Sequence, residues 1–263
     1  SINSDFRYKS SNDFDLKLIT KDLKLHQFLS KNEKLDLSGF LSSEIIINQN
    51  EELQSASAKI ITKNLALNQN LIGDFDFSLS GSPIYKTYKI STSVINDGKK
   101  NILGLGNVFI VDKNINLDVD FNLDDFDLSF LSSFGKNKVN RIQGIVSGNL
   151  NLWGSLSDIK LKGKTTINKG NLYLPITNTE YKIRDKTPIF FQDQSIRFIN
   201  TELLDSYEKT VATANGNLFH KNFKDWGIDL DVTSKRLLLL NRTKNFESRF
   251  YGKGFLNGRA SFK

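Results

Sequence analysis

The sequence has no cysteine and no methionine, and it has three prolines in 263 residues. Without cysteine the chain can form neither a disulfide nor a thiolate metal site, and its redox compartment is left open. Because methionine is missing even at position 1, we expect a fragment or a processed piece of a longer chain. No apolar run approaches the roughly 20 residues of a membrane helix, and no signal peptide opens the sequence. We therefore expect any membrane anchor or export signal to lie outside this chain.

Recognisable catalytic motifs are also missing. The sequence contains no Gly-x-Ser-x-Gly elbow, no Walker loop and no His-Glu-x-x-His motif. His26 and His220 stand far apart beside apolar residues, so we expect them to be structural or exposed. The acidic series from Asp118 to Asp124 resembles the start of a calcium loop, but Leu123 stands where that loop needs glycine. We predict that the protein is not an enzyme and has no catalytic residue, metal site or cofactor.

The formal charge of +7 at pH 7 raises the possibility of an anionic partner, such as nucleic acid or phospholipid headgroups. However, lysine and aspartate are interleaved on the polar positions, as in Asp158-Ile159-Lys160-Leu161-Lys162, which is typical of an ordinary solvated face. A nucleic-acid surface would need basic and aromatic residues on one exposed face. The aromatic residues here fall mostly on the apolar positions, so the sequence predicts no nucleic-acid partner.

Alternation of polar and apolar residues is the main pattern that the sequence does contain. The longest run is Ile115 to Asp124, and others lie at 14–18, 74–79, 149–152, 158–162 and 228–232. A period of two is typical of antiparallel strands with one apolar and one polar face. Glycines Gly154, Gly163 and Gly170 interrupt the runs, and turns are expected at Gly73, 81–83, 96–98 and 215–217. We predict an all-β fold of short strands, preceded by a frayed segment up to about Ser11.

Two stretches depart from the alternation. Leu128, Leu131 and Phe134 are spaced three apart after an Asp-rich start, which predicts a short helix near 126–134. Leu237 to Leu240 is a run of four leucines that is too short to indicate a helix. Three short apolar segments, at 25–30, 128–132 and 237–240, are each followed by an expected strand. These strands begin near Gly39, Gly144 and Gly254, respectively. This spacing of roughly 105 to 110 residues indicates a repeated array.

The alternation leaves three architectures open. Two sheets could stack as a sandwich, one sheet could close into a barrel, or a curved sheet could stay open and keep an apolar trough. In the sandwich the apolar residues would fill a dry core, and in the trough they would face a ligand. Alternation alone does not choose between these two.

A series of motifs runs through the second half of the chain. In order, they are Gly144-Ile145-Val146-Ser147-Gly148-Asn149-Leu150-Asn151-Leu152-Trp153-Gly154, Leu161-Lys162-Gly163, Gly170-Asn171-Leu172-Tyr173-Leu174-Pro175, Tyr181, Pro188-Ile189-Phe190-Phe191, Ile196-Arg197-Phe198, Ala214-Asn215-Gly216-Asn217-Leu218, His220-Lys221-Asn222-Phe223 and Tyr251-Gly252-Lys253-Gly254. With these motifs, the stretch from about Arg141 to Lys263 resembles the C-terminal region of the TamB family, in its Bacteroidetes-like form. This family is the inner-membrane subunit of the translocation and assembly module. Where the family usually has a proline before the second strand of its core motif, this chain has Ser157-Asp158.

The resemblance implies a β-taco, which is a long curved antiparallel-rich sheet folded lengthwise into an open half-pipe with an apolar groove. Residues 1–135 would form an upstream β-repeat, and residues 136–263 a TamB C-terminal-type segment continuous with it. The resemblance also implies a periplasmic protein of a Gram-negative bacterium, anchored in the inner membrane. Its expected partners are phospholipid acyl chains and an outer-membrane Omp85-type barrel of the TamA, TamL or BamA kind. Phospholipid would be the transported ligand, with no cofactor.

On this interpretation the apolar strand faces line a lipid groove. The expected lining residues are Phe75, Phe77, Leu79, Leu117, Val119, Phe121, Leu150, Leu152, Ile159, Leu161, Leu172, Leu174, Ile228, Leu230 and Val232. The expected function is bridge-like transfer of phospholipid from the inner to the outer membrane. The alternative is a scaffold or chaperone that assists the insertion or secretion of outer-membrane β-barrel proteins, by accepting their strands at exposed sheet edges.

Overall fold

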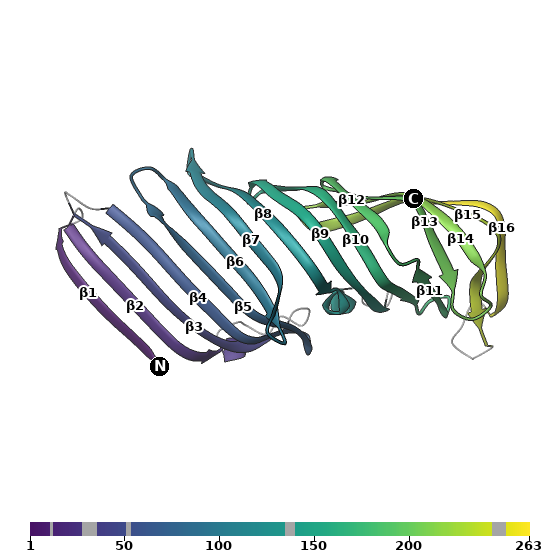
Figure 1. The fold of residues 1–263 in the computed structure, drawn as a ribbon, viewed down its shortest axis with the longest axis horizontal. Helices are drawn as coiled ribbons and strands as arrows, with labels where there is room; N and C mark the ends of the chain where they lie inside the picture. Colours follow the sequence, from purple (N-terminus) through teal and green to yellow (C-terminus); the bar gives the residue numbers. More distant parts are fainter. Residues whose placement is uncertain (11–12, 28–35, 51–53, 135–139, 244–250) are drawn as a thin grey trace. The chain divides into compact units, whose positions relative to one another are not determined.

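Strands dominate the computed structural model of the chain, which describes residues 1–10, 13–27, 36–50, 54–134, 140–243 and 251–263 (Figure 1). Sixteen strands belong to one sheet, and the strand pairs with a defined register are antiparallel. The helical segments in these ranges are two short 3-10 helices, η1 (Leu25–Gln27) and η2 (Ser129–Phe134). The predicted all-β, antiparallel-rich class is confirmed.

The chain divides into two compact units. Unit 1 comprises Ser1–Asp124 with Asn151–Ile159, and unit 2 comprises Asp125–Leu150 with Lys160–Lys263. The first eight strands are β1 (Ile2–Ser10), β2 (Asp13–Lys24), β3 (Leu37–Gln49), β4 (Gln54–Leu67), β5 (Asn70–Ser82), β6 (Thr87–Asn96), β7 (Lys99–Val111) and β8 (Asn114–Asp127). The remaining strands are β9 (Asn140–Ser155), β10 (Asp158–Leu174), β11 (Thr179–Ile183), β12 (Thr187–Asp193), β13 (Ser195–Asp205), β14 (Val211–Lys221), β15 (Lys224–Arg242) and β16 (Gly252–Phe262).

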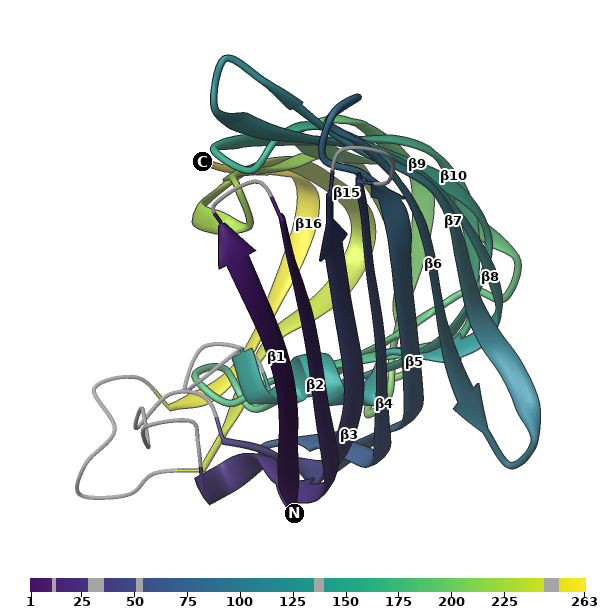
Figure 2. The ribbon, with the colours of Figure 1, turned by 90° about the vertical axis from the view of Figure 1, so that its left-hand side faces the viewer.

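In unit 1, β1 to β8 follow one another in the sheet in chain order, and each strand pairs with the next. These strands lie side by side in a single layer (Figures 1 and 2). β1 forms the edge of the sheet, so the segment that was predicted to be frayed is a strand. Its register with β2, from Ile2 opposite Thr20 to Ser10 opposite Asp13, holds it in place.

A line of irregularities crosses three strands of unit 1. An extra residue lies between Thr20 and Leu23 in β2, between Thr62 and Leu65 in β4, and between Lys100 and Ile102 in β7. Asp22 and Asn64 adopt left-handed conformations at the first two shifts. The Asp22 N–H donates to Ser42 Oγ at 3.1 Å, and the Asn64 N–H donates to Asp74 Oδ1 at 2.9 Å. Because β-bulges bend strands and increase their twist, this line marks where the sheet of unit 1 bends.

In unit 2 the pairings among β10, β11, β12 and β13 close into a ring of four strands. β11 pairs with 171–174 of β10 and 203–205 of β13, whereas β12 pairs with 161–167 of β10 and 195–198 of β13. The register therefore places β11 and β12 end to end, in one position between β10 and β13. At the bend between them, Lys186 is left-handed and its N–H donates to Asn168 Oδ1 at 3.0 Å.

Several local expectations need correction. The strands are long rather than short, and β15 reaches 19 residues. Leu237 to Leu240 lie inside β15 because they continue its pairing with β16. The helix predicted near 126–134 is shorter and starts later, since β8 continues to Asp127, whose Oδ1 accepts the Ser129 N–H at 2.8 Å. In the apolar segment at 25–30, residues 25–27 form the 3-10 helix η1, and residues 28–30 lie outside the described ranges.

The glycines that were interpreted as strand breaks and turns lie mostly inside strands. Gly73, Gly81, Gly154, Gly163, Gly170 and Gly216 are strand residues. Pro83 and Asp97-Gly98 lie in turns as predicted. A Cβ on Gly216 would lie 2.0 Å from the Asp229 carbonyl oxygen, and one on Gly163 would lie 2.3 Å from that of Asn149. Glycine is required at these two positions because neighbouring backbones approach closely, with φ near 141° and 145°, and not because the chain turns.

Candidate functional site

Apolar side chains gather on one face of the unit 1 sheet, in rows that run across the strands. One row from β1 to β8 is Ile2, Thr20, Ser43, Ile60, Phe77, Thr92, Gly104 and Phe121, and the next is Ser4, Leu18, Ile45, Ala58, Leu79, Ile90, Gly106 and Val119. A third row is Phe6, Leu16, Ile47, Ala56, Gly81, Tyr88, Val108 and Leu117, and a fourth is Leu23, Leu41, Thr62, Phe75, Val94, Ile102 and Leu123. Directly opposed residues point to the same side, so these rows define the unit 1 apolar face.

Six of the expected groove residues lie together on this face. They are Phe75, Phe77, Leu79, Leu117, Val119 and Phe121. The ring of Phe121 lies over Gly104, because a Cβ on that glycine would be 2.6 Å from the ring. Leu152 and Ile159, also in unit 1, are half-buried. Leu152 points away from the neighbouring Asn151, whose side chain lies on the opposite face of the sheet with Asp118.

The opposite face of unit 1 is polar and charged. Lys17 and Glu44 form an ion pair at 2.9 Å, and Asn151 Nδ2 donates to Asp118 at 2.8 Å and to Asp120 at 3.0 Å. The acidic series that resembles a calcium loop therefore lies on the polar face of β8. A shallow open hollow of about 430 Å³ also lies on this face, lined mainly by Ser78, Ser80, Ser91, Lys89, Leu105 and Asn107. This hollow results from small serine side chains and is separate from the apolar face.

Most side chains of the unit 1 apolar face are half-buried rather than buried. In the four rows, the hydrophobic side chains with less than a tenth of their surface exposed are Val119, Val94 and Val108. Two threonines of these rows, Thr62 and Thr20, are buried to the same degree. On the polar face the residues enclosed to this degree are Ser93 and Asn101. The apolar face is therefore the more enclosed of the two faces, yet its large side chains, such as Phe77 and Phe121, remain partly accessible.

Unit 2 has a corresponding apolar face. One of its rows is Thr165, Ile189, Phe198, Gly216, Leu230 and Phe262, a second is Gly163, Phe191, Ile196, Leu218 and Ile228, and a third is Thr201, Ala214, Val232 and Ala260. Leu161 shares this side by alternation with Gly163, and Leu150 lies beside Gly163. Leu172 is opposite Tyr181. The expected groove residues of this unit therefore also share a face.

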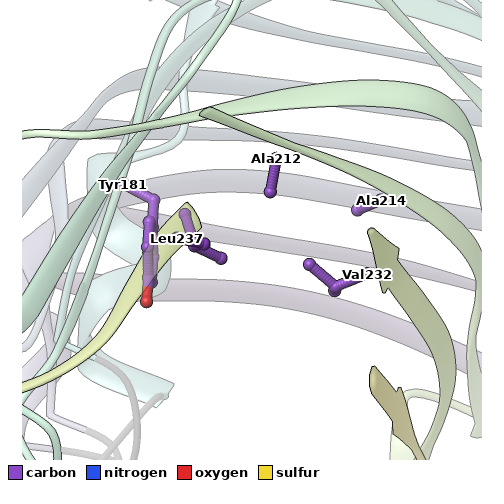
Figure 3. Close-up of a cluster of buried hydrophobic side chains, with 5 residues drawn as sticks. All are labelled: Tyr181, Ala212, Ala214, Val232 and Leu237. Atoms are coloured by element: carbon purple, nitrogen blue, oxygen red, sulfur yellow. The ribbon is translucent and has the colours of Figure 1, made fainter. Parts of the chain in front are cut away.

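Part of this unit 2 face is covered, because the second half of β15 turns over it. Tyr181, Ala212, Ala214, Val232 and Leu237 form a buried cluster, with Leu174 packed against it (Figure 3). The Tyr181 hydroxyl donates to the Leu238 carbonyl at 2.7 Å, and burial raises the pKa of this phenol. Of the expected groove residues, Val232 thus belongs to a closed core, whereas Ile228 is 41% exposed.

The two histidines occupy different surroundings. His26 lies in η1 and is exposed. His220 is buried in unit 2, where its ring stacks on Phe223 with the centroids 4.6 Å apart and lies 5.0 Å from the ring of Trp226. Burial lowers the pKa of His220, so that the neutral imidazole can accept the Phe223 N–H at Nδ1, at 3.2 Å. Hydrogen bonding and stacking within one hairpin account for the position of this residue.

Comparison with known proteins gives this site no precedent, because no protein-family model, no curated protein and no solved structure matches the chain. Among the described residues, no helix has the length and apolar character to cross a membrane. The site is therefore interpreted from its own geometry.

Sequence reasoning missed most of the apolar residues on the unit 1 apolar face. Leu16, Leu18, Ile45, Ile47 and Ile60 belong to it but were not among the expected lining residues. The alternation at 14–18 was a usable signal for β2. In β3 the run Ile45-Ile46-Ile47 is apolar at every position, so the sequence does not indicate which of these residues belong to the apolar face. Ile46 in fact lies on the polar face, opposite Lys17 and Ser57.

Proposed function

We propose that this chain is part of a TamB-type protein that carries phospholipid, with the acyl chains lying on the apolar face. The observation that supports the proposal best is the unit 1 sheet, where four rows of apolar residues run across strands that lie in one layer. An apolar face of this extent without a covering layer needs an apolar ligand or partner.

The dimensions of this face suit an acyl chain. Eight strands spaced about 4.8 Å apart extend over roughly 34 Å. The hydrocarbon core of a bilayer is about 30 Å thick, so one acyl chain covers about 15 Å. A chain lying across the strands would therefore contact only part of the apolar face and could move along the rows from strand to strand.

We further propose that unit 1 is an open half-pipe whose inner surface is the apolar face. Two observations support this shape. The bulges of β2, β4 and β7 lie next to one cross-strand row, the row of Leu23, Thr62 and Ile102, where they bend the strands near the same place. The enclosed residues Thr62, Val94 and Val119 are on the apolar face, as expected for the concave side of a curved sheet.

The free energy of acyl-chain burial explains why no catalytic group is needed. Exposing a CH₂ group to water costs about 0.8 kcal/mol, so two chains of about sixteen carbons cost roughly 25 kcal/mol in total. An apolar surface removes most of this cost along the path, while the headgroup stays in water at the open side. In the cell, the protein would be anchored in the inner membrane, lie in the periplasm of a Gram-negative bacterium and reach an Omp85-type barrel in the outer membrane.

The first test is whether the purified chain carries phospholipid. Native mass spectrometry and lipid extraction should find at least one phospholipid per chain. The variant Phe77→Asp/Phe121→Asp places two carboxylates in one row of the apolar face, and it should lose the lipid while keeping its β-sheet circular dichroism. A folded variant that retains its lipid would refute the apolar face as the binding surface.

A matched control places the same number of charges on the polar face of β5. In Ser78→Asp/Ser80→Asp, the new carboxylates lie opposite Lys59 and Lys89. Since opposite charges directly across a strand pair are stabilising, this variant should fold and keep its lipid. Equal loss of lipid in both variants would indicate an effect of total charge rather than of the apolar face.

A second function, a scaffold for outer-membrane β-barrel proteins, is favoured by the free edge of β1. Every residue of β1 is exposed, with Ile2, Phe6 and Tyr8 between 57% and 61% accessible on the apolar side. A client strand with apolar residues at every second position could pair with this edge. Prolines introduced separately at Ser4 and Asp5 test this idea, because successive N–H groups point to opposite edges of a strand. If the scaffold function holds, the substitution at the outward-facing N–H should abolish client binding without unfolding β1.

A further inference from the structure

The turn between β14 and β15 in unit 2 has an unusual composition. Lys221 and Lys224 are opposed in the register, and the two residues between them, Asn222 and Phe223, are both left-handed, with φ of 49° and 60°. Such a two-residue turn suits asparagine followed by glycine, because both central residues need positive φ. Here a phenylalanine occupies the glycine position.

Three other two-residue hairpins in the described chain have two left-handed residues in the turn, and each has a smaller or flexible residue at this position. They are Asn68-Gln69, Asp97-Gly98 and Asp112-Lys113. All four turns have Asn or Asp first, as the backbone conformation favours. The residue that follows is Gln, Gly or Lys in three of them, so the bulky ring at Phe223 is the exception.

Two local features of this turn oppose folding. A bulky side chain is disfavoured at positive φ, and two like charges directly opposite each other in a strand pair are destabilising. Departures from local sequence preference tend to mark functional positions. Lys221 and Lys224 are both exposed, so their ammonium groups are available to an anionic partner.

The aromatic residues at this tip are held rigidly while they remain exposed. Phe223 stacks on the buried ring of His220, and Trp226 Nε1 donates to the Phe223 carbonyl at 3.1 Å. Even so, Phe223 is 45% exposed and Trp226 is 54% exposed. Phe219 and Ile228 follow on the same hairpin at 43% and 41% exposed. The tip is therefore a fixed aromatic patch with two lysines at the turn.

We propose that this tip, formed by Phe223, Trp226, Lys221 and Lys224, docks on the surface of a lipid bilayer that contains anionic headgroups. Tryptophan and phenylalanine rings are favoured at the boundary between headgroups and acyl chains, and lysine ammonium groups bind headgroup phosphates there. The inference extends the proposed lipid transfer, since Ile228 belongs to the unit 2 apolar face and lies beside the tip. A tip in the bilayer would bring that face to its source or acceptor of lipid.

Vesicle flotation of the whole chain tests the proposal. The probes are vesicles of phosphatidylcholine alone and vesicles with one third phosphatidylglycerol. The chain should float with the anionic vesicles, and Lys221→Ser/Lys224→Ser should bind them about 25-fold more weakly, at about fivefold per lysine. In a Trp153→Phe background, Trp226 is the single indole, and its fluorescence should shift to the blue on binding. Absence of binding, or binding without a blue shift, would overturn the proposal.

Two variants make the result specific. Phe223→Gly relieves the disfavoured conformation but also removes the stacking on His220. The two effects oppose each other, so the unfolding temperature should change little while vesicle binding weakens, a combination that a purely structural role of Phe223 would not give. Tyr85→Ala removes an exposed aromatic residue, 79% accessible, from a turn of unit 1 and should leave binding unchanged. If Tyr85→Ala weakens binding as much as Trp226→Ala does, the attraction is not located at the tip.

The test is independent of lipid carriage. The variant Phe77→Asp/Phe121→Asp leaves the tip intact, so it should still float with anionic vesicles even though it no longer carries phospholipid. Loss of carriage with retained flotation supports both proposals. Carriage by the wild-type chain without flotation refutes the docking tip alone, and flotation without carriage refutes the transfer function alone.

Discussion

The two units use the same alternating pattern but differ in what covers their apolar faces. In unit 1, Phe77 and Leu79 lie on a single layer of strands and remain half-buried. In unit 2, Leu237 and Leu238 are 1% and 0% exposed, because the second half of β15 folds over β11 and β14. Alternation thus specifies which residues share a face, and it does not specify whether another segment covers that face.

Small residues and specific hydrogen bonds make the difference. Ala212 and Ala214 leave room over β14 into which Leu237 packs (Figure 3). The β10–β11 turn then binds the end of β15, where Asn178 Nδ2 donates to the Asn241 carbonyl at 2.6 Å and the Asn241 N–H donates to the Thr177 carbonyl at 2.9 Å. Large side chains such as Phe75, Phe77 and Phe121 occupy the unit 1 face instead, where they suit contact with a ligand.

The largest expected effect comes from truncating a leucine in each unit. Leu237→Ala should lower the free energy of unfolding of unit 2 by about 2–5 kcal/mol, because it leaves a cavity in a closed core. Leu79→Ala should cost under about 1 kcal/mol, because its side chain is already partly in water. Urea titrations followed by site-resolved hydrogen exchange measure both effects. Equal costs would mean that a second layer covers the unit 1 face in solution, contrary to the open sheet.

A smaller effect is expected from removing one hydroxyl in each unit. Tyr181→Phe deletes a buried hydrogen bond to the Leu238 carbonyl, so it should cost about 1–2 kcal/mol. Tyr88→Phe is the matched change on the unit 1 face, where the half-buried side chain remains within reach of water, and we expect it to be nearly neutral. A cost at Tyr88 similar to that at Tyr181 would contradict the difference between an open and a closed face.

Much of the fold was predictable because the alternation of polar and apolar residues indicates which side chains of a strand share a face. The run from Ile115 to Asp124 predicted which residues of β8 share the apolar face, and the run at 74–79 did so for β5. The hairpin turn at Asp97-Gly98 was predictable because its backbone needs the left-handed conformation that these residues tolerate.

The remaining features depend on long-range contacts. Gly163 and Gly216 are indistinguishable by sequence from turn glycines, because their requirement comes from a carbonyl on the neighbouring strand. The covering of Val232 depends on Leu237, which reaches it only after β15 bends at the register shift between Ser234 and Leu237. The edge strand β1 looked frayed because its alternation, with Ser4 among Ile2, Phe6 and Tyr8, is weakly apolar. Pairing with β2 overrides that weak signal.

The smallest expected effect concerns pH and compares one carboxylate from each unit. Hydrogen bonds from the Lys63 ammonium and the Asn64 N–H hold the pKa of Asp74 below its usual range, and Arg259 and Ser261 do the same for the pKa of Asp231. A carboxylate with a lowered pKa in the folded state stabilises the protein above its unfolded pKa of about 3.9, and this contribution disappears as the pH falls through the folded value.

Asp74→Asn should therefore lower stability at pH 7 by less than about 1 kcal/mol, the range of exposed ion pairs, and should flatten the loss of unit 1 stability below about pH 4. Asp231→Asn should change stability less, because Asp74 Oδ1 also accepts the backbone N–H of the bulge residue Asn64, whereas Asp231 is held by side chains. Hydrogen exchange of β4 and β5 at pH 7 and pH 3 measures the first change, and that of β15 and β16 measures the second. If Asp74→Asn leaves exchange around Asn64 unaltered at both pH values, this carboxylate does not hold the bulge, and the bend of the unit 1 sheet depends on the backbone alone.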